Sequence, residues 1–224
     1  PEDARYEHYM RAGEHTIEWT MNNCARENLS PDGLGAKIWA HADAGVVAPE
    51  EAAVLVRALL SAGLDTTVIA IGNTLRCLTA NPDQWDLVHA TPRLTKFAID
   101  EALRFESPFQ SFFRTTSREV SFGGVTLPED SKLIVFPGAA NRDVERFGPD
   151  ADQYRIEREA GGHLTFGMGI HQCVGQPISR LEMDVLFGEL ARRVRSIEPA
   201  GEPVPFLHNT LRGLSSLPVR IVPA

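Results

Sequence analysis

The chain has 224 residues, 43% of them hydrophobic, and a formal net charge of -8 at pH 7. This length and composition predict a folded protein with a sizeable core and exclude a largely disordered chain. The acidic balance, without any basic run, argues against binding to nucleic acid or to an anionic membrane surface. Three irregularly spaced cysteines fit neither a disulfide framework nor a zinc knuckle. Because the first residues also lack the features of a signal peptide, we expect a cytoplasmic protein.

Helical patterns dominate the first half of the sequence. Apolar residues at helical spacing predict a helix over 4–28, and a shorter one is expected over 34–42. Pro49-Glu50-Glu51 opens the longest predicted helix and Asn81-Pro82 closes it.

The composition of this long helix predicts where it lies. Between Arg57 and Arg76 only Asp65 is charged, and apolar residues occur on every face, which is typical of a helix running through the middle of a protein. Several hydroxyl and amide side chains in the same stretch make a membrane span a poor interpretation.

The second half mixes helices with short strands. Helices are predicted over 82–89, 94–105 and 177–194, strands in a small meander over 119–122, 125–127 and 132–136, and a hairpin over 207–222. The expected fold class is therefore mainly α with small β-sheets, and the sequence shows no internal repeat or interdomain linker.

The middle of the long helix carries an unusual stretch, Ala62-Gly63-Leu64-Asp65-Thr66-Thr67. A glycine here and a threonine hydroxyl that bonds back to the carbonyl four residues earlier should loosen or widen the helix locally. One interpretation is a packing notch for a crossing helix. The other is an acid beside an alcohol that delivers protons.

The helix over 94–105 has a carboxylate on its apolar stripe, since Glu101 follows Phe97 and Ala98 and Arg104 lies one turn further on. Glu-x-x-Arg is also frequent on exposed helix faces, where such a pair stabilises little. The position on the apolar stripe favours a buried ion pair.

The glycine-rich phrase Phe166-Gly167-Met168-Gly169-Ile170-His171-Gln172-Cys173-Val174-Gly175 precedes the last long helix. Its glycines allow left-handed turns and a close approach to a flat ligand. Backbone N–H groups and the helix dipole point towards the sulfur of Cys173 and stabilise a thiolate. A thiolate that binds a cofactor, a nucleophile with His171 as its base, and a buried inert cysteine are the three interpretations at this point.

These three motifs together resemble the cytochrome P-450 family, in the order and spacing of that family. The glycine-rich phrase is similar to its haem-binding loop, Glu101 to Arg104 to its Glu-x-x-Arg, and Ala62 to Thr67 to its oxygen-activating segment. Asn141-Arg142-Asp143 resembles the bacterial members. The resemblance covers essentially the whole chain and implies the C-terminal part of a single cytochrome P-450 domain over 1–224, with the N-terminal part absent.

The resemblance implies a role for each matching residue. Cys173 would be the axial thiolate on the iron of haem b, in the loop that also contains Phe166, Gly167 and Gly175. His171 and Arg114 would hold the haem propionates, and Asp65 and Thr66 would relay protons to bound dioxygen.

Other matching residues concern the core and the substrate. Glu101 with Arg104 would hold the core beside the haem together. The positions that would line the substrate pocket are Leu64, Phe109, Phe112 and Leu214.

The segment Asp150 to Arg158 departs from the family pattern, in which Asp-Pro-Asp-x-Phe-Asp-x-x-Arg supplies a third partner for the Glu-Arg pair. The sequence therefore leaves this partner open. Ser179 in place of the usual alanine before Arg180 is a milder departure.

The implied activity is that of a haem-thiolate monooxygenase that activates O2 to hydroxylate or O-demethylate a small organic substrate. The phrases around Phe105 to Pro108, Phe112 to Thr116 and Asn209 to Leu214 most resemble bacterial enzymes that oxidise para-substituted benzoic acids. Electrons would come from NAD(P)H through a ferredoxin reductase and an iron-sulfur ferredoxin, which Arg180, Arg192 and Arg193 would dock. A monomer is expected. The alternatives are a truncated haem-binding protein without turnover and an H2O2-dependent peroxygenase.

Overall fold

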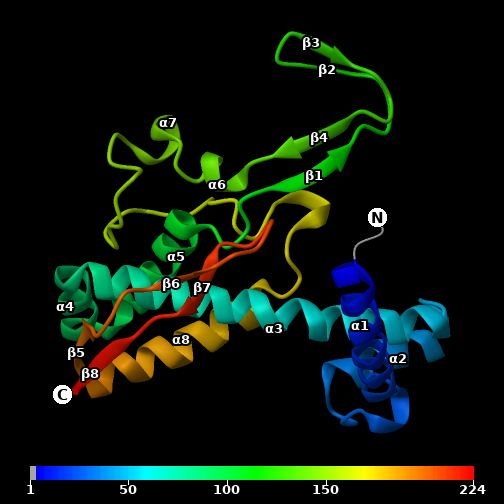
Figure 1. Cartoon of the computed structure of the whole chain (residues 1–224), viewed down its shortest axis with the longest axis horizontal. Helices are drawn as coiled ribbons and strands as arrows, with labels where there is room; N and C mark the ends of the chain where they lie inside the picture. Colours follow the sequence, from blue (N-terminus) through cyan, green and yellow to red (C-terminus); the bar gives the residue numbers. More distant parts are fainter. Residues whose placement is uncertain (1–3) are drawn as a thin grey trace. The chain divides into compact units, whose positions relative to one another are not determined.

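A computed structural model describes residues 4–224 and divides the chain into two compact units, one ending at Asp65 and the other covering Thr66–Ala224. The division falls inside the longest helix. Figure 1 traces the elements of each unit along the chain.

The first unit is helical. Its elements are α1 (Ala4–Asn23), the 3-10 turn η1 (Arg26–Asn28), α2 (Leu34–Asp43) and the first part of α3 (Pro49–Ala80). The predicted helix over 4–28 was too long. The Asn23 side chain donates to Trp19 O at 2.8 Å, and the Asn28 side chain donates to Asn22 O at 2.8 Å. These two amides bond backbone carbonyls in the last turn of α1, and the helix ends there.

The predicted ends of α3 are confirmed. The carboxylate of Glu51, three residues into the helix, accepts the N–H of Ala48 at 2.9 Å, and the Asn81 side chain donates to Cys77 O at 2.8 Å. The expected local widening was wrong, because every residue from Pro49 to Ala80 is α-helical. A hydroxyl bond to the carbonyl four residues earlier fits a regular helix, as Thr74 Oγ1 to Ala70 O at 2.8 Å shows.

The predicted position of α3 in the middle of the protein is found for only part of the helix. Leu64 is 61% exposed and Val68 is 67% exposed, whereas Cys77 and Leu78 near the end of the helix are almost completely buried. Among the described residues, α3 is the one helix long and apolar enough to cross a membrane by length and composition. Its polar Asn73 and Thr74 are buried against protein, which is typical of a core helix.

The second unit contains the main core. Its helices are the rest of α3, α4 (Pro82–Ala90), η2 (Pro92–Leu94), α5 (Thr95–Glu106), α6 (Pro137–Ala140), α7 (Val144–Phe147), η3 (Gly169–His171) and α8 (Gln176–Arg193). The helices α3, α4, α5 and α8 supply most of the buried side chains, including Trp85, Ile99, Met183 and Phe187. Trp85 also donates its indole N–H to Arg195 O at 2.9 Å, which joins α4 to the strand after α8.

Four two-stranded antiparallel sheets complete the second unit. The pairs are β1 (Phe112–Thr115) with β4 (Lys132–Val135), β2 (Val120–Phe122) with β3 (Val125–Leu127), β5 (Val194–Pro199) with β8 (Val219–Pro223), and β6 (Val204–Phe206) with β7 (Gly213–Ser216). The predicted strands over 119–136 exist, but they form no meander because β4 pairs with β1. The predicted hairpin over 207–222 was wrong, because β7 pairs back with β6 and β8 pairs with the distant β5.

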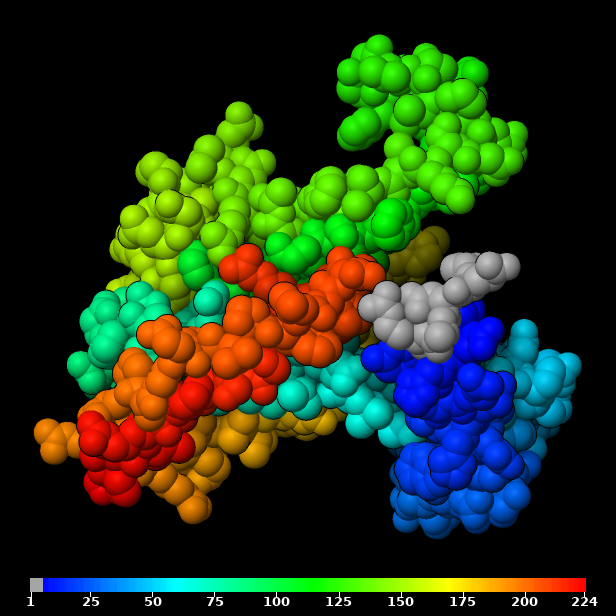
Figure 2. All heavy atoms as spheres, viewed as in Figure 1, coloured from blue at the N-terminus to red at the C-terminus, as the bar shows by residue number. Residues whose placement is uncertain are grey.

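The hairpin of β2 and β3 stands away from the rest of its unit, as the green spheres in Figure 2 show. Phe122 is 78% exposed near its tip, where Gly123 and Gly124 both have positive φ angles. The glycine pair predicted as a turn is therefore a turn of the left-handed kind that glycine permits.

Candidate functional site

The glycine-rich loop presents a free cysteine just before α8. Cys173 is exposed, whereas Cys24 and Cys77 are buried. The loop is closed by the bond from Cys173 N to Phe166 O at 2.8 Å. Gly167 has φ +67°, and a Cβ there would lie 3.2 Å from His171 O, so any other residue would be strained in this turn.

The surroundings of this sulfur fit a flat apolar group that binds through a single thiolate. Met168, Ile170 and Val174 are 72%, 97% and 84% exposed. A Cβ on Gly175 would lie 3.7 Å from the Cys173 sulfur, at ordinary van der Waals distance, so the loop packs against the sulfur on this side. Among the described residues, no three His, Cys, Asp or Glu side chains gather to hold a metal ion by themselves. A single sulfur donor fits a metal that is held mainly by a cofactor, as an iron is in haem.

The predicted Glu101–Arg104 pair is fully buried, with both side chains 0% exposed. Arg104 Nε and Nη2 each donate to a Glu101 carboxylate oxygen at 2.8 Å. The guanidinium also donates to the backbone carbonyls of Asn141, Ala151 and Gln153. A buried charge pair of this kind is tolerated because its remaining hydrogen-bonding groups are satisfied.

The third partner, which the sequence left open, is Arg158. Its Nε donates to Glu101 Oε1 at 3.1 Å, and its Nη1 donates to Asp150 Oδ1 at 2.9 Å. Hydrogen bonds from Arg158 and Arg155 lower the pKa of Asp150 to about 2. The altered segment 150–158 therefore completes the cluster with the arginine of the family pattern.

Asn141 links this cluster to the segment before the cysteine loop, and sequence reasoning gave it no role. It is 0% exposed, its Nδ2 donates to Ser107 Oγ at 2.7 Å and to Thr165 Oγ1 at 3.0 Å, and its Oδ1 accepts Leu164 N at 2.6 Å. Thr165 Oγ1 in turn donates to Leu103 O at 2.6 Å. The phrase Asn141-Arg142-Asp143 carries the signal, but from the sequence alone it predicts no physical function.

A second contact joins α5 to α8 beside the loop. Asp100 forms an ion pair with Arg180, whose guanidinium lies 5.1 Å from the ring centre of Phe166. Burial raises the pKa of Asp100, but the nearby His163 and Arg180 outweigh burial, so its pKa is lowered. Arg180 is thus neutralised inside the protein.

The other two arginines expected to dock a ferredoxin share one carboxylate. Arg192 and Arg193 both pair with Glu189 at the end of α8. This helix end therefore keeps one excess positive charge.

The predicted acid and alcohol lie next to each other on α3, at the boundary between the two units. Asp65 is exposed and, with the predicted substrate contact Leu64, lies in the first unit, whereas Thr66 begins the second. Thr67 is buried and its Oγ1 donates to Ser179 Oγ of α8 at 3.2 Å. The departure from alanine at Ser179 therefore supplies a hydrogen bond between α3 and the helix that follows Cys173.

The structure brings two of the predicted substrate contacts together. The rings of Phe109 and Phe112 stack with their centres 4.8 Å apart. Phe109 also forms a β-bridge with Leu211, in the turn that leads to the half-buried Leu214. Arg114 is exposed on β1 and donates to Phe113 O at 2.8 Å.

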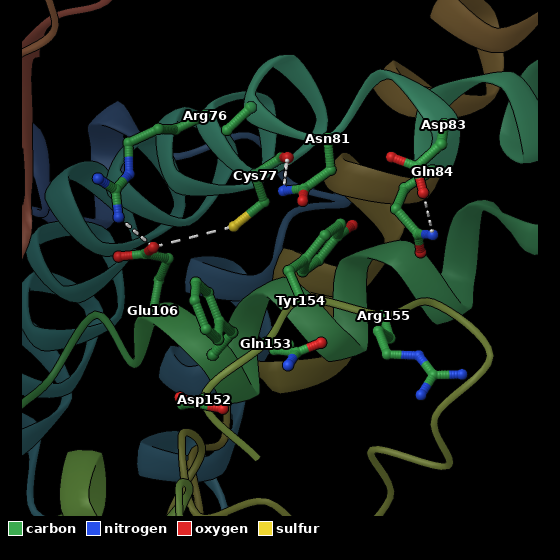
Figure 3. A pocket seen from close by; sticks show the side chains of 12 residues that line it. Arg76, Cys77, Asn81, Asp83, Gln84, Glu106, Asp152, Gln153, Tyr154 and Arg155 are labelled. Atoms are coloured by element: carbon green, nitrogen blue, oxygen red, sulfur yellow. Dashed lines mark hydrogen bonds and ion pairs between the residues drawn. The ribbon is translucent and has the colours of Figure 1, made fainter. Parts of the chain in front are cut away.

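The pocket drawn in Figure 3 lies elsewhere in the second unit and has a volume of about 520 Å³. It is lined by residues such as Arg76, Cys77, Glu106 and Tyr154, and none of the predicted site residues lines it. Burial, followed by the charge of Glu106, raises the pKa of the Cys77 thiol well above its usual value. A buried protonated thiol is inert, so Cys173 is the better candidate for chemistry.

Comparison with protein families gives one match, the family described as Cytochrome P450, over residues 84–222. The chain is 47% identical to Cytochrome p450 CYP199A2 of Rhodopseudomonas palustris over 224 residues, which are 100% of this chain and 54% of that protein. It is 34% identical to 6-deoxyerythronolide B hydroxylase of Saccharopolyspora erythraea, covering 97% of this chain and 55% of that one. The chain therefore spans about half the length of the curated relatives it matches.

Solved structures agree with this comparison. The tirandamycin C-bound P450 monooxygenase TamI superposes with a TM-score of 0.86 at 32% identity, covering 95% of this chain and 54% of that one. Cytochrome P450 CYP109Q5 from Chondromyces apiculatus gives a TM-score of 0.74 at 37% identity, covering 80% and 46%. The predicted fold class, mainly α with small sheets, is confirmed.

Proposed function

The chain belongs to the cytochrome P450 family, and from this premise we propose that it is the C-terminal part of a single haem-thiolate monooxygenase domain. The observation that carries the proposal is Cys173, a free and exposed cysteine in a glycine-rich loop at the start of α8. Asn141 and Thr165 tie the segment before this loop to the buried Glu101–Arg104 cluster. Both compact units belong to the proposed domain because α3 runs through both.

In this proposal Cys173 binds the iron of haem b, and the loop from Phe166 to Gly175 holds the sulfur in place. Arg114 and His171, both exposed, hold the haem carboxylates through charge-assisted hydrogen bonds. When bound, the haem supplies the activation of O2, so that one oxygen atom enters the substrate and the other leaves as water with two electrons and two protons.

The chain's own residues supply proton transfer. Asp65 carries a carboxylate and Thr66 a hydroxyl at neighbouring positions of α3, so a proton can pass between solvent, the carboxylate and the Thr66 Oγ1 atom. A protein that only binds haem has no need of this pair. Its presence supports turnover.

The proposed substrate is a small aromatic carboxylic acid that is hydroxylated or O-demethylated. The stacked rings of Phe109 and Phe112 suit a flat aromatic ring, and Leu214 adds an apolar contact. The resemblance of the neighbouring phrases to bacterial benzoate-oxidising enzymes supports this choice.

The proposed electron source is NAD(P)H, through a ferredoxin reductase and an iron-sulfur ferredoxin. The excess positive charge of Arg192 and Arg193 over Glu189 provides a point of contact for an acidic ferredoxin. Arg180, the third arginine proposed for docking, pairs with Asp100 and so adds no net positive charge of its own. The proposed protein is a cytoplasmic monomer.

A second candidate is that this chain by itself binds haem without turning over substrate. The observation that favours it is the coverage of 54% of CYP199A2. The two candidates share the cysteine ligand and differ in activity.

The test of haem ligation is the spectrum of the reduced carbon monoxide complex. The purified chain is mixed with haem, reduced and exposed to carbon monoxide, and a strongly red-shifted Soret band is expected from thiolate ligation. A band at the position typical of histidine ligation, or no haem uptake, contradicts the proposal for this chain.

The test of proton transfer uses the Thr66→Ala variant in the protein extended to the full length of its relatives. Electron consumption is expected to exceed product formation, because proton delivery fails while electrons still arrive. Ser61→Ala on the same helix is the matched control. If the ratio of product formed to electrons consumed is the same in both variants, the role of Thr66 is contradicted.

A further inference from the structure

A second buried carboxylate, Glu106 at the end of α5, joins segments that are far apart in sequence. Its side chain is 1% exposed. One carboxylate oxygen accepts from Arg76 of α3, and the other accepts from Arg212 Nε at 3.2 Å. Figure 3 shows the carboxylate pointing towards Arg76 and Cys77, and all three residues line the pocket.

The surroundings of Glu106 are rich in positive charge. The Arg142 guanidinium lies 4.2 Å from the ring centre of the neighbouring Phe105 and donates to Phe105 O at 2.7 Å. Burial lowers the pKa of Arg142, and the charge of Glu106 opposes that shift. Glu106 is thus the counter-charge for several guanidinium groups, and its loss would leave them to repel one another.

Arg212 lies in the turn between β6 and β7, and both its backbone N–H and its carbonyl form hydrogen bonds. Arg212 N donates to Pro108 O at 2.8 Å, and Arg212 O accepts from Asn73 Nδ2 of α3 at 2.9 Å. Gln110 N donates to Thr210 O at 3.2 Å, beside the β-bridge between Phe109 and Leu211.

The next residue brings the turn against α3. A Cβ on Gly213 would lie 2.9 Å from the Ile69 side chain, so the backbone approaches the helix as closely as glycine permits. A small displacement of Arg212 would therefore move both the turn and the start of β7.

We propose that Glu106 and Arg212 are positioning residues for the substrate pocket, because their ion pair fixes the turn over 207–212 and thereby the places of Phe109 and Leu214. The inference rests on the proposed function, since only that function makes Phe109 and Leu214 substrate contacts. Neither Glu106 nor Arg212 needs to contact the substrate. Their effect on specificity passes through the turn.

The first test measures amide hydrogen exchange in the chain itself. Arg212→Gln breaks the ion pair by changing its half-exposed partner, whose side chain is 49% exposed. Glu106→Gln breaks the same pair by changing its buried partner. The amides of Arg212 and Gln110 are expected to exchange about tenfold faster in both variants, as for the loss of one hydrogen-bonded contact in a local opening.

Arg220→Gln is the matched control. Arg220 pairs with Glu198 between β8 and β5, and its side chain is 73% exposed. The turn amides should exchange in this control at the wild-type rate. If the turn amides exchange at the same rate in Arg212→Gln as in Arg220→Gln, the ion pair does not fix the turn and the proposal is overturned. If Glu106→Gln fails to fold, the comparison of the two arginine variants still decides.

The second test uses the haem-loaded protein extended to the full length of its relatives. Arg212→Gln is expected to raise KM for a para-substituted benzoate about tenfold while kcat and the carbon monoxide spectrum stay unchanged. An unchanged KM with faster turn exchange overturns the role in specificity. A wild-type protein without the thiolate spectrum contradicts the proposed function instead, and leaves the exchange result for the turn intact.

Discussion

The Glu101–Arg104 cluster and the Cys173 loop lie in the same unit and differ in how the chain completes them. Glu101 and Arg104 are 0% exposed, and the protein itself supplies their hydrogen-bonding partners, including Arg158 and three backbone carbonyls. Cys173 is exposed among exposed apolar side chains. Folding alone satisfies the charged groups of the cluster, whereas the loop leaves the Cys173 sulfur exposed to bind a ligand.

This difference predicts separate consequences for mutations in the two motifs. Changes in the cluster should reduce the stability of the chain, because they leave buried charge without a partner. Changes at the cysteine should alter ligand binding and leave the fold in place. Each of the following experiments tests one side of that separation.

Breaking the cluster should give the largest effect. Glu101→Gln leaves the Arg104 guanidinium buried without its counter-charge, and the free energy of unfolding should fall by about 3–5 kcal/mol. Urea denaturation followed by circular dichroism measures the loss. Glu198→Gln, in the exposed pair with Arg220, is the matched control and should leave stability unchanged. Equal stability of the two variants would contradict the structural role of the cluster.

Cys173→Ser should change ligand binding and little else. The free energy of unfolding of the chain alone should stay within about 0.5 kcal/mol of wild type, because the thiol is exposed. The red-shifted Soret band of the reduced carbon monoxide complex should be lost. Cys24→Ser, at a buried cysteine, is the control that should retain the band. A band that survives Cys173→Ser would show that another residue binds the iron.

Acid should weaken the outer part of the cluster through Asp150. Its pKa in the folded protein is about 2, below the usual 3.8, so the carboxylate stabilises the fold above about pH 4 and this contribution is lost as the pH falls towards 2. Asp150→Asn removes this dependence, and its stability should fall less than that of wild type between pH 4 and pH 2. Parallel stability curves for the two proteins over this range would contradict the assignment.

The bond between α3 and α8 should have the smallest effect. Ser179→Ala removes the partner of the buried Thr67 hydroxyl, which lies 3.2 Å from Ser179 Oγ, and should cost about 0.5–1.5 kcal/mol. Ser215→Ala, where the hydroxyl bonds to Val204 O on an exposed strand, is the control and should cost less. Thermal unfolding of the two variants gives the comparison. A gain in stability for Ser179→Ala would show that the bond does not hold the helices together.

The predictions from sequence succeeded where the signal was local. Pro49, Glu51 and Asn81 marked the ends of α3 because start and stop signals act within one turn of a helix. Glu101 on an apolar stripe indicated a buried pair, since only a paired carboxylate is tolerated there.

Long-range pairing could not be predicted in the same way. The strands β4 and β8 were expected beside their sequence neighbours, but they pair with β1 and β5. A strand of four or five residues carries too little pattern to specify its partner, and tertiary packing makes that choice.

By itself, the sequence indicated the type of chemistry: a cysteine in a glycine-rich loop, an acid beside an alcohol, and a buried Glu-Arg pair in the order of one family. The tertiary structure decided which residues complete these motifs. Arg158 closes the cluster, Asn141 ties it to the segment before the cysteine loop, and Glu106 with Arg212 holds the turn beside Phe109. The physical reason is that the chemistry of a side chain can be read from its residue type. Its partner depends on how segments distant in sequence pack together.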